Sequence, residues 1–238
     1  MSPAPTLSRL DTAPDLVDQV YRKLLDAISD GSMAPGTRLT QEDVAEQLAV
    51  SRQPVLQALR QLRADGLVQD ALGPQGQKGR GVVVTPIDAT TVAQVYEVRS
   101  ALDAQAARLA ARRRALIDPA LITAGRTAAA AGQVKAMIDA DLAYHRAIYQ
   151  ASGNPLIEAS ALLHWHHIRR AMGEALQHSP LRAAAWDEHE AMCHAIARGD
   201  EAAATQLMLA HGTQAGANLA RQLLAAQPPA APLNSVVR

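Results

Sequence analysis

The stretch that decides the fold runs from Glu42 to Leu59 and reads EDVAEQLAVSRQPVLQAL. Its first part, 42–48, has the apolar spacing of a short helix, and Ala49-Val50 follows as a tight turn. A second helix is expected to start at Ser51, whose hydroxyl is placed to cap the first free amides, with Pro54 in the first turn, where a missing N–H is tolerated. Two short helices joined this closely are typical of a helix-turn-helix.

The second helix of this pair has two different faces. At helical spacing its apolar side chains face a core, and these are Val55, Ala58, Leu59 and Leu62. The other faces carry Arg and Gln, which suit the base edges in a major groove. Many ordinary helix pairs share this periodicity, so the pattern alone also fits a helical protein without a DNA partner. From this helix we expect DNA contacts by Ser51, Arg52, Gln53 and Gln57.

The residues that follow predict a two-stranded wing. Gly66-Leu67-Val68 ends the helix and begins a strand, Gly73-Pro74-Gln75-Gly76 turns, and residues 79–84 return as a second strand. Lys78 and Arg80 on this wing can reach phosphates or the minor groove. The sequence therefore predicts a winged helix-turn-helix.

This part of the chain, about residues 13–87, resembles the amino-terminal signature of the GntR family of bacterial transcription regulators. The resemblance is carried by Ala34-Pro35-Gly36-Thr37-Arg38-Leu39, Ser51-Arg52-Gln53-Pro54-Val55, Ala58-Leu59, Leu62 and Gly66-Leu67-Val68. The family usually has Arg-Glu after its Pro-Val, and that Arg reaches the DNA, whereas this chain has Leu56-Gln57. Either the operator is read differently or the contact is weaker, and Lys78 and Arg80 offer contacts that compensate.

Composition points to a helical protein without a disulfide. Of 238 residues, 48% are hydrophobic, only 3% are aromatic and Phe is absent, so the core must be built from aliphatic side chains on close-packed helices. Cys193 is the one cysteine, which excludes an internal disulfide. There is neither an amino-terminal apolar stretch with a cleavage site nor an apolar run of roughly 18 residues, so we expect a cytoplasmic protein without a membrane partner.

The net charge is zero, yet positive charge gathers on the motif. Residues 51–80 carry five basic side chains against Asp65 and Asp70. A patch this modest binds tightly only when two subunits act together. We therefore expect a homodimer on an inverted repeat of double-stranded operator DNA, with strongly salt-dependent binding.

The chain divides into four segments. We expect a disordered arm over 1–12, the winged domain over 13–87, an all-helical domain over 88–226 and a mobile tail over 227–238. The boundary follows the wing, because Pro86 cannot continue a strand ladder. Beyond it, spacing predicts helices at 89–114, 118–130, 133–151, 155–178, 181–198 and 201–225. Their short connections predict an antiparallel bundle, so the fold class is mainly α.

Four polar side chains interrupt the apolar seams of this bundle. Asp141 and His145 lie one turn apart on a seam with Val134, Ile138 and Ile148. His189 shares a seam with Trp186, Cys193 and Ile196. His211 shares a third seam with Leu207, Ala215 and Leu219. An Asp-His-His-His set from three helices suits Zn²⁺, with Ni²⁺ or Mn²⁺ as alternatives. A single buried histidine is more often a hydrogen-bonded core residue, so that interpretation stays open beside the metal site.

The same part of the chain, about residues 89–225, resembles the FCD-type ligand domain of the FadR subgroup of GntR regulators. The resemblance is carried by Asp141-Leu142-Ala143-Tyr144-His145, Ser152-Gly153-Asn154-Pro155-Leu156, Glu188-His189-Glu190, Ala195-Ile196, Gly199-Asp200 and His211. It implies that Asp141, His145, His189 and His211 hold a metal ion. Tyr144, where Phe is usual, departs from the motif. Five histidines lie outside it, and for these a hydrogen-bonded or exposed role is expected: His164, His166, His167, His178 and His194.

Arg99 is a cation on the inward seam of the first bundle helix. Its partner is either internal, Asp103 or Glu97, or the carboxylate of a small effector, as the resemblance implies. Arg170, whose helical phase does not place it clearly inside, and Asn154 are the other candidate effector contacts. Small and aliphatic seam residues favour a compact organic acid.

Together these patterns predict a metabolite-responsive transcription regulator without catalytic residues. One alternative is a metal-dependent hydrolase, because Glu188 and Glu190 flank a proposed ligand. A helix turns about 100° per residue, so neither glutamate shares the inward direction of His189. A second alternative is an architectural DNA-binding protein, for which a buried metal and a buried arginine have no purpose.

Overall fold

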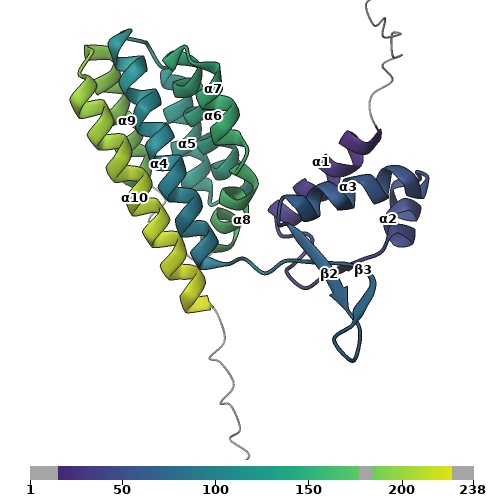
Figure 1. Ribbon diagram of the computed structural model, residues 1–238. Coiled ribbons are helices and arrows are strands. Elements are labelled where there is room, and N and C mark those ends of the chain that lie inside the picture. Colours follow the sequence, from purple (N-terminus) through teal and green to yellow (C-terminus); the bar gives the residue numbers. More distant parts are fainter. Residues whose placement is uncertain (1–15, 177–183, 227–238) are drawn as a thin grey trace, which may run out of the picture. The chain divides into compact units, whose positions relative to one another are not determined.

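The computed structural model describes residues 16–176 and 184–226, which form two compact units (Figure 1). The first unit takes in residues up to Thr85, apart from Ser29–Ser32, and the second begins at Pro86. The expected arm over 1–12 and tail over 227–238 lie outside the described residues, as does His178. Among the described helices, none is long and apolar enough to cross a membrane.

The first unit is the predicted winged helix-turn-helix. Three helices and a three-stranded antiparallel sheet of order β1-β3-β2 surround one apolar core. The elements are α1 Leu16–Ser29, β1 Arg38–Leu39, α2 Gln41–Leu48, α3 Arg52–Ala64, β2 Val68–Leu72 and β3 Lys78–Val84. The inward residues expected of the second motif helix, including Val55 and Leu62, are fully buried. Strand β1 was not predicted, because two residues are too short to show a periodic pattern.

Local geometry explains how the helix pair forms. Thr40 caps α2, because its hydroxyl accepts a hydrogen bond from the Asp43 amide. Ala49 adopts a left-handed conformation with φ of 52°, which makes the predicted tight turn. Ser51 is the N-cap of α3, but its hydroxyl oxygen accepts no cap hydrogen bond, so that expectation is wrong. Pro54 occupies N3, one of the two positions whose N–H can donate to such a cap, and proline has no N–H.

The second unit is the predicted helical bundle. Its elements are α4 Ala89–Arg112, α5 Pro119–Ala131, α6 Val134–Ser152, α7 Pro155–Leu162, α8 Trp165–Leu176, α9 Ala184–Arg198 and α10 Glu201–Ala226. The single helix expected over 155–178 is wrong, because the chain breaks after Leu162 and a new helix begins at Trp165. The His164 carbonyl accepts hydrogen bonds from the amides of His167 and Ile168, which starts α8. No Pro or Gly marks this break in the sequence.

Helix α10 packs along α4, side by side in Figure 1. Two glycines of α10 allow this close approach. A Cβ atom on Gly212 would lie 2.3 Å from Oγ of Ser100, and one on Gly216 would lie 2.6 Å from Cβ of Tyr96. The buried stripe of α10 passes through Met208 and Gly212, so Leu207, expected to face inward, is 38% exposed. His211 therefore lies at the edge of this stripe, beside Gly212.

Candidate metal centre

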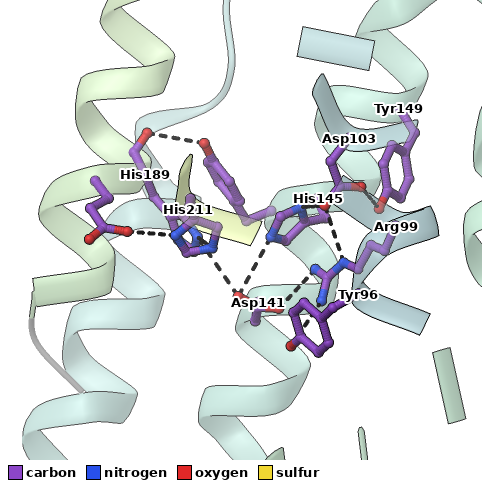
Figure 2. Close-up of polar contacts among 10 residues, drawn as sticks. Tyr96, Arg99, Asp103, Asp141, His145, Tyr149, His189 and His211 are labelled. Atoms are coloured by element: carbon purple, nitrogen blue, oxygen red, sulfur yellow. Dashed lines mark hydrogen bonds and ion pairs between the residues drawn. The ribbon is translucent and has the colours of Figure 1, made fainter. Parts of the chain in front are cut away.

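The structure brings the four predicted ligand side chains together inside the bundle (Figure 2). Asp141 and His145 come from consecutive turns of α6, His189 from α9 and His211 from α10. One ligand atom from each residue lies within 4.8 Å of the other three. Nε2 of His189 is 3.2 Å from Nε2 of His211, and Oδ1 of Asp141 is 3.7 Å from Nε2 of His145 and 3.8 Å from Nε2 of His189. A single central ion can reach all four atoms after small inward movements.

The chemistry of these four side chains fits a divalent metal. Asp141, His145 and His189 are buried, and within the described part of the chain neither ring nitrogen of His145 has a hydrogen-bond partner. Burial lowers the pKa of His189 well below its usual value, and the neighbouring His211, His145 and Arg99 lower it further. The ring of His189 is therefore neutral, which leaves a nitrogen lone pair to donate. Three imidazoles and one carboxylate form a donor set that Zn²⁺ accepts.

Carboxylates lie behind two of the three histidines. Nδ1 of His211 is 2.6 Å from Oε2 of Glu188, and Nδ1 of His145 is 3.2 Å from Oδ2 of Asp103. A proton held on Nδ1 leaves the Nε2 lone pair facing the cluster. The expectation that Glu188 does not share the inward direction of His189 agrees with its exposure, 51% for the side chain. Its side chain does not share the direction of His189, but it reaches His211 on the neighbouring helix.

Tyr144 supports the third histidine. Its ring stacks on the imidazole of His189, with centroids 4.0 Å apart, and its hydroxyl donates a 3.1 Å hydrogen bond to the His189 carbonyl oxygen. A Phe at this position could stack but could not donate. The departure from the family motif thus adds a contact between α6 and α9.

Arg99 has internal partners, one of the two alternatives that the sequence left open. Its Nε donates to Oδ2 of Asp103 at 3.2 Å, and its Nη2 donates to Oδ2 of Asp141 at 3.4 Å. Nη1 lies 3.5 Å from the Tyr96 hydroxyl. Burial would lower the pKa of Arg99, but Asp103, Tyr96, Tyr149 and Asp141 raise it well above its usual value. Glu97, the other predicted partner, is exposed.

Asp103, predicted only as a possible partner of Arg99, also lies beside His145 in this cluster. It is fully buried, and burial alone would raise its pKa. Arg99, His145 and a hydrogen bond from the Tyr149 hydroxyl instead lower that pKa to about 2, so Asp103 is a carboxylate. Its position four residues after Arg99 is what made it a predicted partner of that arginine, but no sequence signal linked it to His145.

The other two effector candidates differ in environment. Arg170 on α8 is buried, and this burial lowers its pKa. Asn154 is the N-cap of α7, where its side-chain oxygen accepts a hydrogen bond from the Leu156 amide. The capping role gives Asn154 a structural function whether or not it touches an effector.

All six predicted DNA contacts are exposed in the first unit: Ser51, Arg52, Gln53, Gln57, Lys78 and Arg80. One carboxylate links the recognition helix with the wing. Oε1 of Glu42 lies 3.2 Å from Nη1 of Arg52 and 3.5 Å from Nη2 of Arg80. Lys78 pairs with Asp70 at 3.2 Å.

Two family descriptions match the chain. The FCD domain matches residues 94–214, and the gntR family of bacterial regulatory proteins matches residues 16–84. The HTH-type transcriptional regulator LutR of Bacillus subtilis is 29% identical over 210 residues, which cover 78% of this chain and 93% of LutR. The uncharacterized regulator YdhC of the same organism is 30% identical over 101 residues, and the alignment covers 42% of each protein. The chain thus spans about half or less of the length of several curated relatives that it matches.

Solved structures share the fold. The structure of E. coli McbR/YncC superposes with a TM-score of 0.70 at 21% identity, covering 87% of this chain and 98% of that one. A GntR regulator from Rhodococcus sp. RHA1 superposes with a TM-score of 0.69 at 24% identity, covering 89% and 99%. The match to the gntR regulatory proteins lies in the winged unit, and the match to the FCD domain lies in the helical unit. The chain therefore belongs to the gntR family of bacterial regulatory proteins and carries an FCD domain.

Proposed function

We propose that this chain is a metabolite-responsive transcription regulator that binds operator DNA as a homodimer and senses a small carboxylic acid through a metal in its FCD domain. The observation that carries the proposal is the convergence of Asp141, His145, His189 and His211 in a chain that also has a winged helix-turn-helix. These four side chains would hold the ion, Zn²⁺ in preference to Ni²⁺ or Mn²⁺. When bound, the metal supplies open coordination positions for an effector oxygen.

The charges in the cluster support an anionic effector that depends on the metal. Asp103 and Asp141 bring two negative charges against the one positive charge of Arg99. An incoming carboxylate would be repelled by this set alone. A divalent cation reverses the sign, so that the same residues attract one anion. Arg99 would then bind the anion from a fixed position, because its Nε is hydrogen-bonded to Asp103. Its Nη atoms point toward Asp141 and Tyr96.

The effector can control DNA binding only by binding unequally to two arrangements of the dimer, one competent for the operator and one not. The hydrolase alternative is not favoured, because the matched families are regulators and not enzymes. In addition, the Glu188 carboxylate is hydrogen-bonded to His211, which lowers the pKa of Glu188. This carboxylate therefore supports a proposed ligand and is not a free general base. An architectural role leaves the buried cluster without a purpose.

Footprinting on the upstream region of the gene tests the DNA-binding part. Wild-type protein should protect a short inverted repeat, and Arg52→Ala should lose this protection with its helical content unchanged. Arg22→Ala is a matched control, because Arg22 is an exposed arginine of the same unit that pairs with Asp18 on α1. Full specific affinity in Arg52→Ala would show that the recognition helix is misplaced.

A thermal-shift screen of carboxylic acids tests the sensing part. An effector that binds only the folded protein raises its melting temperature. We expect the best acid to stabilise zinc-loaded wild type but neither metal-stripped protein nor Arg99→Ala. If the strongest stabiliser is uncharged, or if metal removal leaves its effect intact, the effector site lies elsewhere.

A further inference from the structure

Asp103 contacts Arg99, His145 and Tyr149 in the polar network behind the cluster (Figure 2). Its Oδ2 accepts the 3.2 Å hydrogen bond from Nε of Arg99 and also lies 3.2 Å from Nδ1 of His145. Its Oδ1 accepts a hydrogen bond from the Tyr149 hydroxyl. The side chain is fully buried, so water cannot replace any of these partners. Two hydrogen-bond donors and an adjacent imidazole thus fix the orientation of this buried carboxylate.

This arrangement determines how two of the proposed ligands face the metal position. A carboxylate beside Nδ1 of His145 favours the tautomer with the proton on Nδ1, which leaves the Nε2 lone pair free. Neither ring nitrogen of His145 makes a hydrogen bond within the described residues, but Nδ1 lies 3.2 Å from Oδ2 of Asp103, whereas Nε2 faces Asp141 at 3.7 Å. Asp103 also holds Arg99, whose Nη2 donates a hydrogen bond to Oδ2 of Asp141. The other carboxylate oxygen of Asp141, Oδ1, therefore faces His145 and His189.

We infer that Asp103 is a positioning residue of the metal centre: it sets the tautomer of His145 directly and the orientation of Asp141 through Arg99. The inference rests on the proposed metal site, but its tautomer part concerns the metal-free protein as well. Glu188 offers a contrast. It stands behind His211 in the same way, yet its side chain is 51% exposed, so water can take over its hydrogen bond. Burial makes Asp103 the carboxylate that cannot be replaced.

The first test uses wild-type protein stripped of metal. Long-range ¹H–¹⁵N NMR correlations distinguish the two imidazole tautomers. For His145 we expect a protonated Nδ1 and an unprotonated Nε2 at pH 8. A proton on Nε2 would overturn the inference. This measurement requires no variant and no bound metal.

The second test measures Zn²⁺ affinity by competition with a chelator. Asp103→Asn keeps the volume of the side chain but removes its charge, and affinity should fall roughly 10–100-fold, as for other carboxylates behind metal-bound histidines. Asp118→Asn is the matched control, because Asp118 caps α5, which contributes none of the four ligands, and an Asn can cap in its place. Its affinity should equal that of wild type.

Circular dichroism of both variants must show wild-type helix content for the comparison to count. If Asp103→Asn does not fold, the tautomer measured in wild type decides. A folded Asp103→Asn with wild-type zinc affinity would overturn the inference and leave the proposed function intact. A wild-type protein that binds no zinc would instead refute the proposed metal site, whatever the tautomer of His145.

Discussion

Replacing Arg99 by methionine should destabilise the FCD domain strongly in the absence of metal. Methionine keeps much of the length of the side chain but removes the guanidinium that pairs with Asp103 and Asp141. Asp103 is fully buried and Arg99 is 6% exposed, so the change leaves carboxylates inside the bundle without their cation. Removing one partner of a buried ion pair costs about 3–5 kcal/mol. For a domain of this size, that corresponds to a fall in melting temperature of roughly 10 °C or more.

Arg126→Met is the matched control for this prediction. Arg126 also bridges two carboxylates, Asp187 at 2.7 Å and Glu190 at 2.9 Å, and both distances are shorter than those of Arg99. Its side chain is 44% exposed, however, so water solvates all three groups when the pair is lost. The melting temperature of Arg126→Met should therefore stay close to that of wild type.

The assay is thermal unfolding of metal-free wild type and both variants, followed by circular dichroism at 222 nm, and then repeated with Zn²⁺. Bound zinc neutralises Asp141 in place of Arg99, so the loss in Arg99→Met should be smaller in the zinc-loaded protein. Equal melting temperatures for metal-free Arg99→Met and wild type would refute the reasoning. A loss in Arg126→Met as large as that in Arg99→Met would refute the claim that burial decides the cost.

Two further predictions concern the packing of α10 and the DNA-binding face. Gly212→Ala places a Cβ atom 2.3 Å from Oγ of Ser100, so we expect α10 to shift away from α4 and zinc affinity to fall. In urea unfolding, overpacking should lower the free energy of unfolding by about 1–3 kcal/mol, and the higher helix propensity of alanine should offset about 1 kcal/mol of this loss. Unchanged zinc affinity would contradict the claim that the packing of α10 places His211. Glu42→Gln removes the carboxylate that pairs with Arg52 and Arg80, so affinity for unrelated duplex DNA should rise in fluorescence anisotropy, and an unchanged or lower affinity would contradict it.

Features that depend on neighbouring residues could be predicted from the sequence. The helix pair around Ala49 and Ser51 follows from turn and capping preferences, which act within a few residues. The inward direction of Asp141 and His145 follows from the helical period alone. The four residues that the structure brings together could therefore be named from the sequence, although the seam expected for His211 was wrong at Leu207.

Features that depend on the distance and rotation between elements could not be predicted. Strand β1 exists because Arg38 pairs with Val83, far along the chain. Glu188 reaches His211 although its own helix turns it away from the seam of His189. The missing Ser51 cap has a local reason, since Pro54 removes one of the two N–H groups that could donate to the hydroxyl oxygen. Helical periodicity specifies a direction for each side chain, but not which neighbour it meets.

The stoichiometry of bound zinc tests the central claim most directly. Wild-type protein and His189→Ala are stripped with a chelator, incubated with excess Zn²⁺, desalted and analysed by plasma mass spectrometry. His189 is buried among the other three ligands, so its removal eliminates a donor that water cannot easily replace. We expect about one zinc ion per chain in wild type and far less in His189→Ala, both with native helix content. Wild type without zinc, or a variant that retains as much zinc as wild type, would contradict the proposed metal centre.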